Sequence, residues 1–236
     1  MLKRLGRDDP FPPPETALKD PNGLLCAGAD LTAARLLAAY RQGIFPWYSG
    51  DEPILWWSPD PRMVLFCDEL KVPRSLAKSV RNKGYQVTVD RCFEEILLNC
   101  SKSRKDGAGT WLGNDMRKAY LALRQTGHAH SFETWQGDQL VGGLYGVSIG
   151  RMFYGESMFS RATDASKVAL VALVETLRER GFPMIDCQQR TPLLASLGGR
   201  EIPRRPFLRR VTTLVNYPEP PGKWTSRETA PKHVSA

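Results

Sequence analysis

The sequence predicts an α+β protein with a small N-terminal domain, residues 1–61, and a larger mixed α/β domain, residues 62–236. Short segments of β-branched, aromatic and alternating apolar residues, bounded by turn residues, predict strands in the larger part. Apolar residues at helical spacing between these segments predict helices. Two prolines in the segment 58–61 interrupt regular structure and mark the boundary between the two parts.

The N-terminal part is rich in proline, glycine and tryptophan and contains one clear helix. Thr32 is a suitable N-cap, and Leu36, Leu37 and Tyr40 form an apolar face. Gly43 follows the last periodic residue and ends the helix.

The larger part alternates strands and helices. The expected strands are Met63–Phe66, Tyr85–Val89, His130–Trp135, Gln139–Val147, Arg151–Glu156 and Met184–Asp186. The expected helices are Cys92–Cys100, Asp115–Gln125 and Ala165–Arg180, the last ended by Gly181. A helix, several antiparallel strands, a long helix and a further strand form the order of an N-acyltransferase-like (GNAT-like) domain. The proline-rich tail from Tyr217 is expected on the surface or disordered.

Composition predicts a cytoplasmic protein without a membrane segment, and a monomer is expected because nothing in the sequence suggests a dimer interface. Hydrophobic residues make up 42% of the chain, but the longest apolar runs, such as Val168–Val174, are too short to span a bilayer. The N-terminus lacks the apolar stretch of a signal peptide.

Five cysteines without a C-x-x-C pair favour reduced thiols. Cys187, between two polar strand residues, is expected to point away from their face as a structural thiol. His128 and His130 lack a third ligand, so no metal is expected.

The chain carries a net charge of +8, which predicts attraction to polyanions. Basic residues are clustered, and Arg74, Lys78 and Arg81 are spaced to lie along one face of a helix. A single charged run is usually a solvated face. Several such runs together with tryptophans indicate contact with a nucleic-acid backbone.

Two segments place polar residues within apolar, strand-like sequence. They are Phe153-Tyr154-Gly155-Glu156-Ser157-Met158-Phe159-Ser160 and Ile185-Asp186-Cys187-Gln188. A buried polar group without a partner costs about 1–3 kcal/mol, so such residues indicate a site. Further unusual strings are Arg41-Gln42-Gly43-Ile44-Phe45-Pro46-Trp47, Ile54-Leu55-Trp56-Trp57-Ser58-Pro59-Asp60-Pro61-Arg62, Gly109-Thr110-Trp111, Gly127-His128-Ala129-His130-Ser131, Leu140-Val141-Gly142-Gly143-Leu144-Tyr145-Gly146-Val147 and Ser196-Leu197-Gly198. In this order, over residues 11–210, the strings closely resemble the bacterial leucyl/phenylalanyl-tRNA–protein transferase family.

The resemblance implies transfer of Leu or Phe, and less well Met, from aminoacyl-tRNA to the α-amino group of proteins that begin with Arg or Lys. The added residue would mark the acceptor for degradation by the N-end rule pathway. Because an aminoacyl ester is already activated, no ATP, metal or organic cofactor is expected. The segment 160–167 before the long helix contains no glycine, which disfavours the close approach of a coenzyme A pyrophosphate.

The resemblance assigns the catalytic roles to Asp186, Gln188 and Glu156. On a regular strand Asp186 and Gln188 share one face, so the carboxylate could polarise the amide that positions the incoming amine. Glu156 would fix the aminoacyl end or the ribose. The alternatives are an Asp186 that caps a loop and a Glu156 that pairs with a nearby arginine.

The resemblance also implies an apolar pocket for the amino-acid side chain, lined by Phe153, Met158, Leu170 and Ile185. Taken singly, each of these residues is equally well explained as an ordinary residue of the hydrophobic core. Position 173 is Leu where the family has an aromatic residue, so we expect a roomier pocket and a shifted preference between Leu and Phe.

Trp47 and Trp111 match the family positions where the terminal adenosine stacks, an interaction worth about 1–3 kcal/mol per base. Trp56 and Trp57 lie at the domain junction, where packing is the better explanation.

Two other functions remain open from the residues alone. One is a coenzyme A-dependent N-acetyltransferase on the same fold, and the other is a non-catalytic RNA-binding module.

Overall fold

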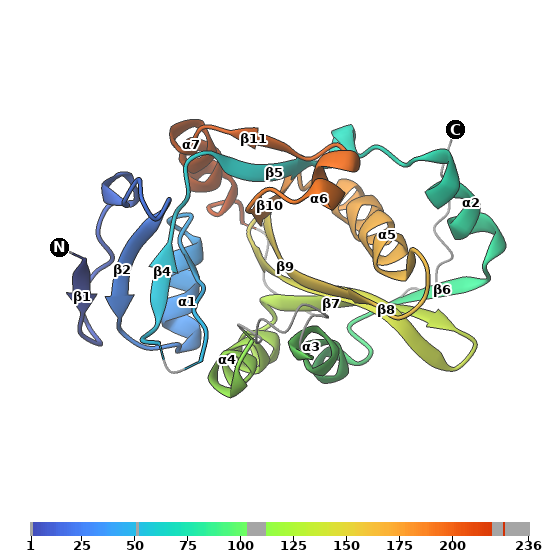
Figure 1. Ribbon diagram of the computed structural model, residues 1–236, viewed down its shortest axis with the longest axis horizontal. Helices are drawn as coiled ribbons and strands as arrows, with labels where there is room; N and C mark the ends of the chain where they lie inside the picture. Colours follow the sequence, from blue (N-terminus) through green and yellow to red (C-terminus); the bar gives the residue numbers. More distant parts are fainter. Residues whose placement is uncertain (1, 51, 103–111, 219–223, 225–236) are drawn as a thin grey trace.

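The computed structural model describes residues 2–50, 52–102, 112–218 and 224, and within them the backbone forms two separate sheets. A four-stranded sheet with the order β1-β2-β4-β3 lies at the N-terminal end of the molecule, beside helix α1 (Figure 1). A seven-stranded sheet with the order β11-β5-β10-β9-β8-β7-β6 forms the rest (Figure 1).

The small sheet is built from short strands. They are β1 (Lys3–Leu5), β2 (Leu24–Gly28), β3 (Phe45–Pro46) and β4 (Leu55–Trp57). Strands β1 and β2 are parallel, whereas β4 pairs antiparallel with β2 and β3. The predicted helix is confirmed as α1 (Ala33–Tyr40), and the Thr32 side chain accepts a hydrogen bond from the Arg35 amide as its N-cap.

The tryptophans at the junction contribute to packing, as expected. Trp56 is completely buried, its indole N–H donates to the Gly28 carbonyl at 2.9 Å, and the Phe11 ring meets it edge-on at 4.8 Å. Trp57 donates from its indole nitrogen to the Trp47 carbonyl at 2.6 Å. This bond fixes the backbone that carries Trp47.

The large sheet confirms all six strands predicted for this part of the chain, with ends shifted by up to a few residues. Its strands are β5 (Arg62–Phe66), β6 (Tyr85–Val89), β7 (Ala129–Gln136), β8 (Gln139–Ile149), β9 (Met152–Ser160), β10 (Met184–Gln188) and β11 (Arg200–Ile202). Strands β9 and β10 are parallel, and the other neighbours are antiparallel.

Helices cover both faces of the large sheet. Helix α5 (Ala165–Glu179) lies on one face, while α3 (Phe93–Ser101) and α4 (Asn114–Gln125) lie on the other (Figure 1). The remaining helices are α2 (Arg74–Asn82), α6 (Pro192–Ser196), α7 (Arg204–Leu214) and the 3₁₀ turns η1 (Pro14–Thr16) and η2 (Cys67–Glu69). The predicted mixed α/β architecture is therefore present. Across the described segments, every helix is too short or too polar to cross a bilayer.

Trp224 belongs to the core of the large sheet, although the sequence predicted a tail on the surface from Tyr217 onward. Only 5% of Trp224 is exposed, and its indole stacks on the His130 ring at 4.2 Å. It also contacts the rings of Phe153 and Phe182. An isolated tryptophan in a polar segment gives no periodic signal, so sequence patterning could not predict this anchor.

Candidate active site

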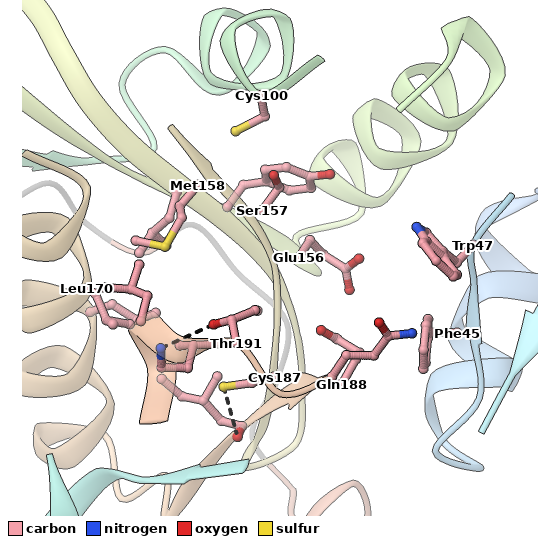
Figure 2. Close-up of a pocket in the computed structure, with 18 of the residues that line it drawn as sticks. Phe45, Trp47, Cys100, Glu156, Ser157, Met158, Leu170, Cys187, Gln188 and Thr191 are labelled. Carbon is pink, nitrogen blue, oxygen red and sulfur yellow. Dashed lines mark hydrogen bonds between the residues drawn. The ribbon is translucent and has the colours of Figure 1, made fainter. Parts of the chain in front are cut away.

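A cavity of about 590 Å³ lies between the large sheet, helix α5 and strand β3 of the small sheet. Its walls carry apolar side chains at one end and polar groups near β3. Figure 2 shows Met158 and Leu170 on one side of it, with Glu156 and Gln188 facing Phe45 and Trp47 on the other. The parallel strands β9 and β10 pair only at Phe153–Ile185 and Tyr154–Asp186, so beyond these residues they are no longer paired and side chains from distant segments reach one space.

The apolar end is lined by Leu144, Met158, Leu170, Leu173 and Ile185. Three of the four residues predicted for the aminoacyl pocket are therefore part of this lining. Leu173 lies in the same wall, so the departure from the family pattern at this position falls on the cavity itself.

Phe153 occupies a different place from its three predicted partners. It is completely buried in the core and is not among the residues that line the cavity. Its backbone pairs with that of Ile185 across β9 and β10, and its ring lies against Gly146. Phe153 therefore supports the wall from behind.

Glu156 is held by two tyrosine hydroxyls. Tyr40 of α1 donates to one carboxylate oxygen at 2.7 Å, and Tyr120 of α4 donates to the other at 2.6 Å. The two hydroxyl oxygens are 3.0 Å apart. Burial raises the pKa of Glu156 to about 7, because the loss of hydration outweighs the two hydrogen bonds that favour the carboxylate. The partners of Glu156 in the described chain are tyrosines rather than the arginine considered from sequence.

Gln188 projects from an irregular end of β10. Its φ is 55°, in the left-handed region, and the strand register shifts between Asp186 and Gln188. As a result both Cys187 and Gln188 line the cavity, so the expectation that Cys187 points away from its neighbours is wrong. Burial raises the pKa of the Cys187 thiol far above its ordinary value, which fits an unreactive thiol.

The side-chain nitrogen of Gln188 is buried and has no hydrogen-bond partner among the described residues. An amide nitrogen in that state requires an acceptor. A carbonyl or hydroxyl oxygen of a bound substrate would provide one.

Asp186 lies beneath the cavity rather than in its lining. The carboxylate is completely buried and forms two hydrogen bonds with Arg62, at 2.8 Å and 2.7 Å. One of its oxygens also accepts the backbone N–H of Gln188 at 3.0 Å. Asp186 and Gln188 are therefore linked through the backbone, not through a shared strand face.

Trp47 lies at the edge of the cavity with 40% of its surface exposed. Its ring meets the Trp57 ring edge-on at 5.5 Å, which leaves a free aromatic surface at the opening. Trp111, the second predicted stacking residue, lies outside the described residues.

The three basic residues predicted to contact tRNA lie on α2. Arg74, Lys78 and Arg81 are all exposed, while Leu76 and Val80 bury the opposite face of the helix. The predicted helical face is confirmed. Figure 1 places α2 at the far end of the molecule from the small sheet.

The two histidines considered as metal ligands, His128 and His130, have protein partners. His130 bonds to Asp90 through Nδ1 at 2.9 Å, and His128 bonds to the Thr126 hydroxyl at 3.1 Å. Among the described residues, no group of three or more His, Cys, Asp or Glu side chains is arranged to hold a metal ion.

Comparison with known proteins identifies the family. Residues 64–212 match the protein family described as "Leucyl/phenylalanyl-tRNA protein transferase", and residues 29–60 match the family described as its N-terminal domain. The chain belongs to the leucyl/phenylalanyl-tRNA–protein transferase family. It is an aminoacyltransferase, an enzyme that uses aminoacyl-tRNA and protein substrates. Neither an acetyltransferase nor a non-catalytic RNA-binding module agrees with this membership.

Similar proteins span nearly the whole chain. The chain is 57% identical to the leucyl/phenylalanyl-tRNA–protein transferase of Nitrosospira multiformis over 95% of this chain and 97% of that protein. It is 59% identical to the leucyl/phenylalanyl-tRNA–protein transferase of Thiobacillus denitrificans over 91% of this chain and 94% of that protein. Among solved structures it is similar to FemX, with a TM-score of 0.45 and 13% identity over 75% of this chain and 70% of that one.

Proposed function

We propose that this enzyme transfers Leu or Phe, and Met less well, from aminoacyl-tRNA to the α-amino group of proteins that begin with Arg or Lys, which marks them for degradation. The supporting observation is one cavity that combines three features. It has an apolar end, a polar centre formed by Glu156 and Gln188, and the exposed indole of Trp47 at its edge. The preference for Arg or Lys at the acceptor rests on the family resemblance.

The cavity suggests how the aminoacyl end is held. The leucyl or phenylalanyl side chain enters the apolar end between Met158, Leu170 and Ile185, where a methylene is worth about 1–3 kcal/mol. The terminal adenosine stacks on Trp47, and on Trp111 by resemblance. The exposed cations of α2 contact the tRNA backbone. The ester carbonyl then lies at the polar centre, near Glu156 and Gln188.

At this centre the acceptor amine attacks the ester carbonyl. The new amide C–N bond forms, the bond between the carbonyl carbon and the ribose oxygen breaks, and the amine proton passes to the departing ribose oxygen directly or through another group. The carbonyl oxygen of Gln188 accepts an N–H of the amine, while its N–H₂ donates to the substrate. Glu156, with a pKa of about 7, is suited to accept and return a proton near neutrality.

Positioning supplies much of the rate in such a reaction, since the ester is already activated and the amine must only be held against it. We therefore assign no cofactor.

We also propose that residues 1–61 form a small N-terminal domain, that residues 62–236 form an N-acyltransferase-like domain, and that the enzyme acts as a cytoplasmic monomer.

The test combines purified protein with radiolabelled Leu-tRNA and two peptides that differ only in starting with Arg or Ala. We expect label on the Arg peptide alone. Equal labelling of both peptides would refute the acceptor rule. No labelling of either peptide, with folded protein and intact tRNA, would refute the proposed function.

A further inference from the structure

We propose that Arg62 is a positioning residue for aminoacyl transfer, and that Asp186 acts through the backbone of Gln188 rather than by contact with the amine. This inference rests on the proposed function only for its effect on rate. Its structural part, the alignment of Gln188 by a buried ion pair, stands on the geometry alone.

The ion pair is fully enclosed. Both side chains have no exposed surface, and the guanidinium presents Nε and Nη2 to the two carboxylate oxygens of Asp186. A bidentate pair of this kind fixes the plane of the carboxylate as well as its position. Asp186 cannot rotate toward the cavity without breaking both bonds and leaving a buried charge without a partner.

The fixed carboxylate has one further bond, and this bond reaches the cavity. The Asp186 Oδ1 atom accepts the backbone N–H of Gln188 at 3.0 Å, two residues along the chain. Aspartate side chains commonly stabilise turns by this bond. Gln188 adopts φ of 55°, a region that is unfavourable for residues other than glycine. The bond from Asp186 compensates for this conformation, which directs the Gln188 side chain into the cavity.

The same guanidinium also contacts the opposite wall. Its central carbon lies 4.8 Å from the centre of the Phe45 ring and 4.6 Å from that of the Phe207 ring. Phe45 belongs to β3 and lines the cavity, and Figure 2 shows it next to Gln188. Arg62 therefore holds two parts of the site that belong to different sheets, although it is not part of the lining.

Two double variants separate positioning from simple stability. Arg62→Met with Asp186→Leu removes both charges, which often preserves a fold, but also removes the acceptor for the Gln188 amide. Arg62→Met with Asp186→Asn removes the charges and keeps an oxygen acceptor at that place. Substitution of Arg62 alone by an uncharged residue would leave the buried carboxylate without a cation, so the double variants are the sharper test.

The first readout is amide hydrogen exchange at Gln188, which does not depend on activity. We expect exchange at this amide to accelerate about tenfold or more in the leucine double variant and less in the asparagine one. Unchanged protection in the folded leucine variant would overturn the proposal, even if the wild-type enzyme proved inactive in the transfer assay.

The second readout is transfer kinetics. We expect kcat to fall about 100-fold in the leucine double variant, with KM for Leu-tRNA changed less than about threefold, and kcat to be at least about tenfold higher in the asparagine variant. Adding Gln188→Ala to the leucine variant should cost less than about threefold more, because Gln188 is already misplaced. Wild-type kcat in the leucine variant, or additive losses, would overturn the proposal.

If the leucine variant fails to fold, Arg62→Lys provides the test. A lysine donates to the carboxylate from one point and cannot hold it bidentately. We expect kcat to fall at least about threefold with KM unchanged. An unaltered kcat in this folded variant would contradict a positioning role for Arg62.

Discussion

Glu156→Gln tests the electrostatics of the site most sharply, because the substitution keeps the shape of the side chain and removes its charge. The carboxylate is held by Tyr40 and Tyr120, and burial raises its pKa from 4.5 to about 7. Below about pH 4.5 the group is protonated in both the folded and the unfolded chain. Between about pH 4.5 and pH 7 only the unfolded chain loses its proton, so rising pH favours unfolding.

The shift from 4.5 to about 7 corresponds to at most about 3 kcal/mol of free energy of unfolding, lost as pH rises through this window. Since the cavity is open to water, we expect about 1–3 kcal/mol. Urea denaturation of the wild type and Glu156→Gln from about pH 5 to about pH 8 measures this difference. The wild type should lose stability relative to the variant over the window, and the difference should be constant above it.

The matched control is Glu179→Gln, which changes an exposed glutamate at the end of α5. Its stability should follow that of the wild type at every pH. A Glu156→Gln curve that also runs parallel to the wild type would refute the argument that burial raises the pKa of Glu156. In the transfer assay we expect Glu156→Gln to lower kcat about 10- to 100-fold, as loss of a proton-transfer group does.

Three further variants test the substrate contacts. Trp47→Ala should raise KM for Leu-tRNA about tenfold without lowering the melting temperature, since this indole is 40% exposed; a large loss of thermal stability would show that it is core. Leu173→Phe should reduce the ratio of kcat/KM for Phe-tRNA to that for Leu-tRNA about tenfold, because it fills the apolar end; an unchanged ratio would exclude Leu173 from the pocket. Replacing Arg74, Lys78 and Arg81 together by Gln should weaken tRNA binding. The slope of the logarithm of the tRNA association constant against the logarithm of the salt concentration should become less negative by about 2. An unchanged slope would show that α2 does not contact tRNA.

The sequence predicted six of the seven strands of the large sheet, whose central strands β7, β8 and β9 are long and patterned, but not the three-residue β11. Strands β6 and β8 and helix α5 carry continuous apolar or alternating residues between clear turn signals. The small sheet was not predicted, since its strands have two to five residues and the segments that connect them contain several prolines. Segments that short satisfy no periodic pattern, and their pairing depends on tertiary contacts.

The site was predictable where polar residues interrupt apolar strands, as at Glu156 and Gln188. The groups that orient these residues were not. Tyr40 and Tyr120 occupy positions on helices where an aromatic residue indicates core, and only the fold brings their hydroxyls to Glu156. Arg62 follows a proline and gives no sign of a buried partner 124 positions away.

The register of β10 was the other limit. A strand that remains regular would place Asp186 and Gln188 on one face and Cys187 on the other. The shift within this strand instead buries Asp186 and directs its two successors into the cavity. A bulge depends on the hydrogen bonds of neighbouring strands, which the alternation of residue types does not encode.

The most direct test of the account is a crystal structure of the enzyme with a non-hydrolysable phenylalanyl-adenosine in which an amide replaces the ester. The account predicts the phenyl ring between Met158, Leu170 and Ile185, the adenine against Trp47, and the amide carbonyl near Gln188. A phenyl ring bound outside the apolar end of the cavity, or an adenine bound away from Trp47, would contradict it.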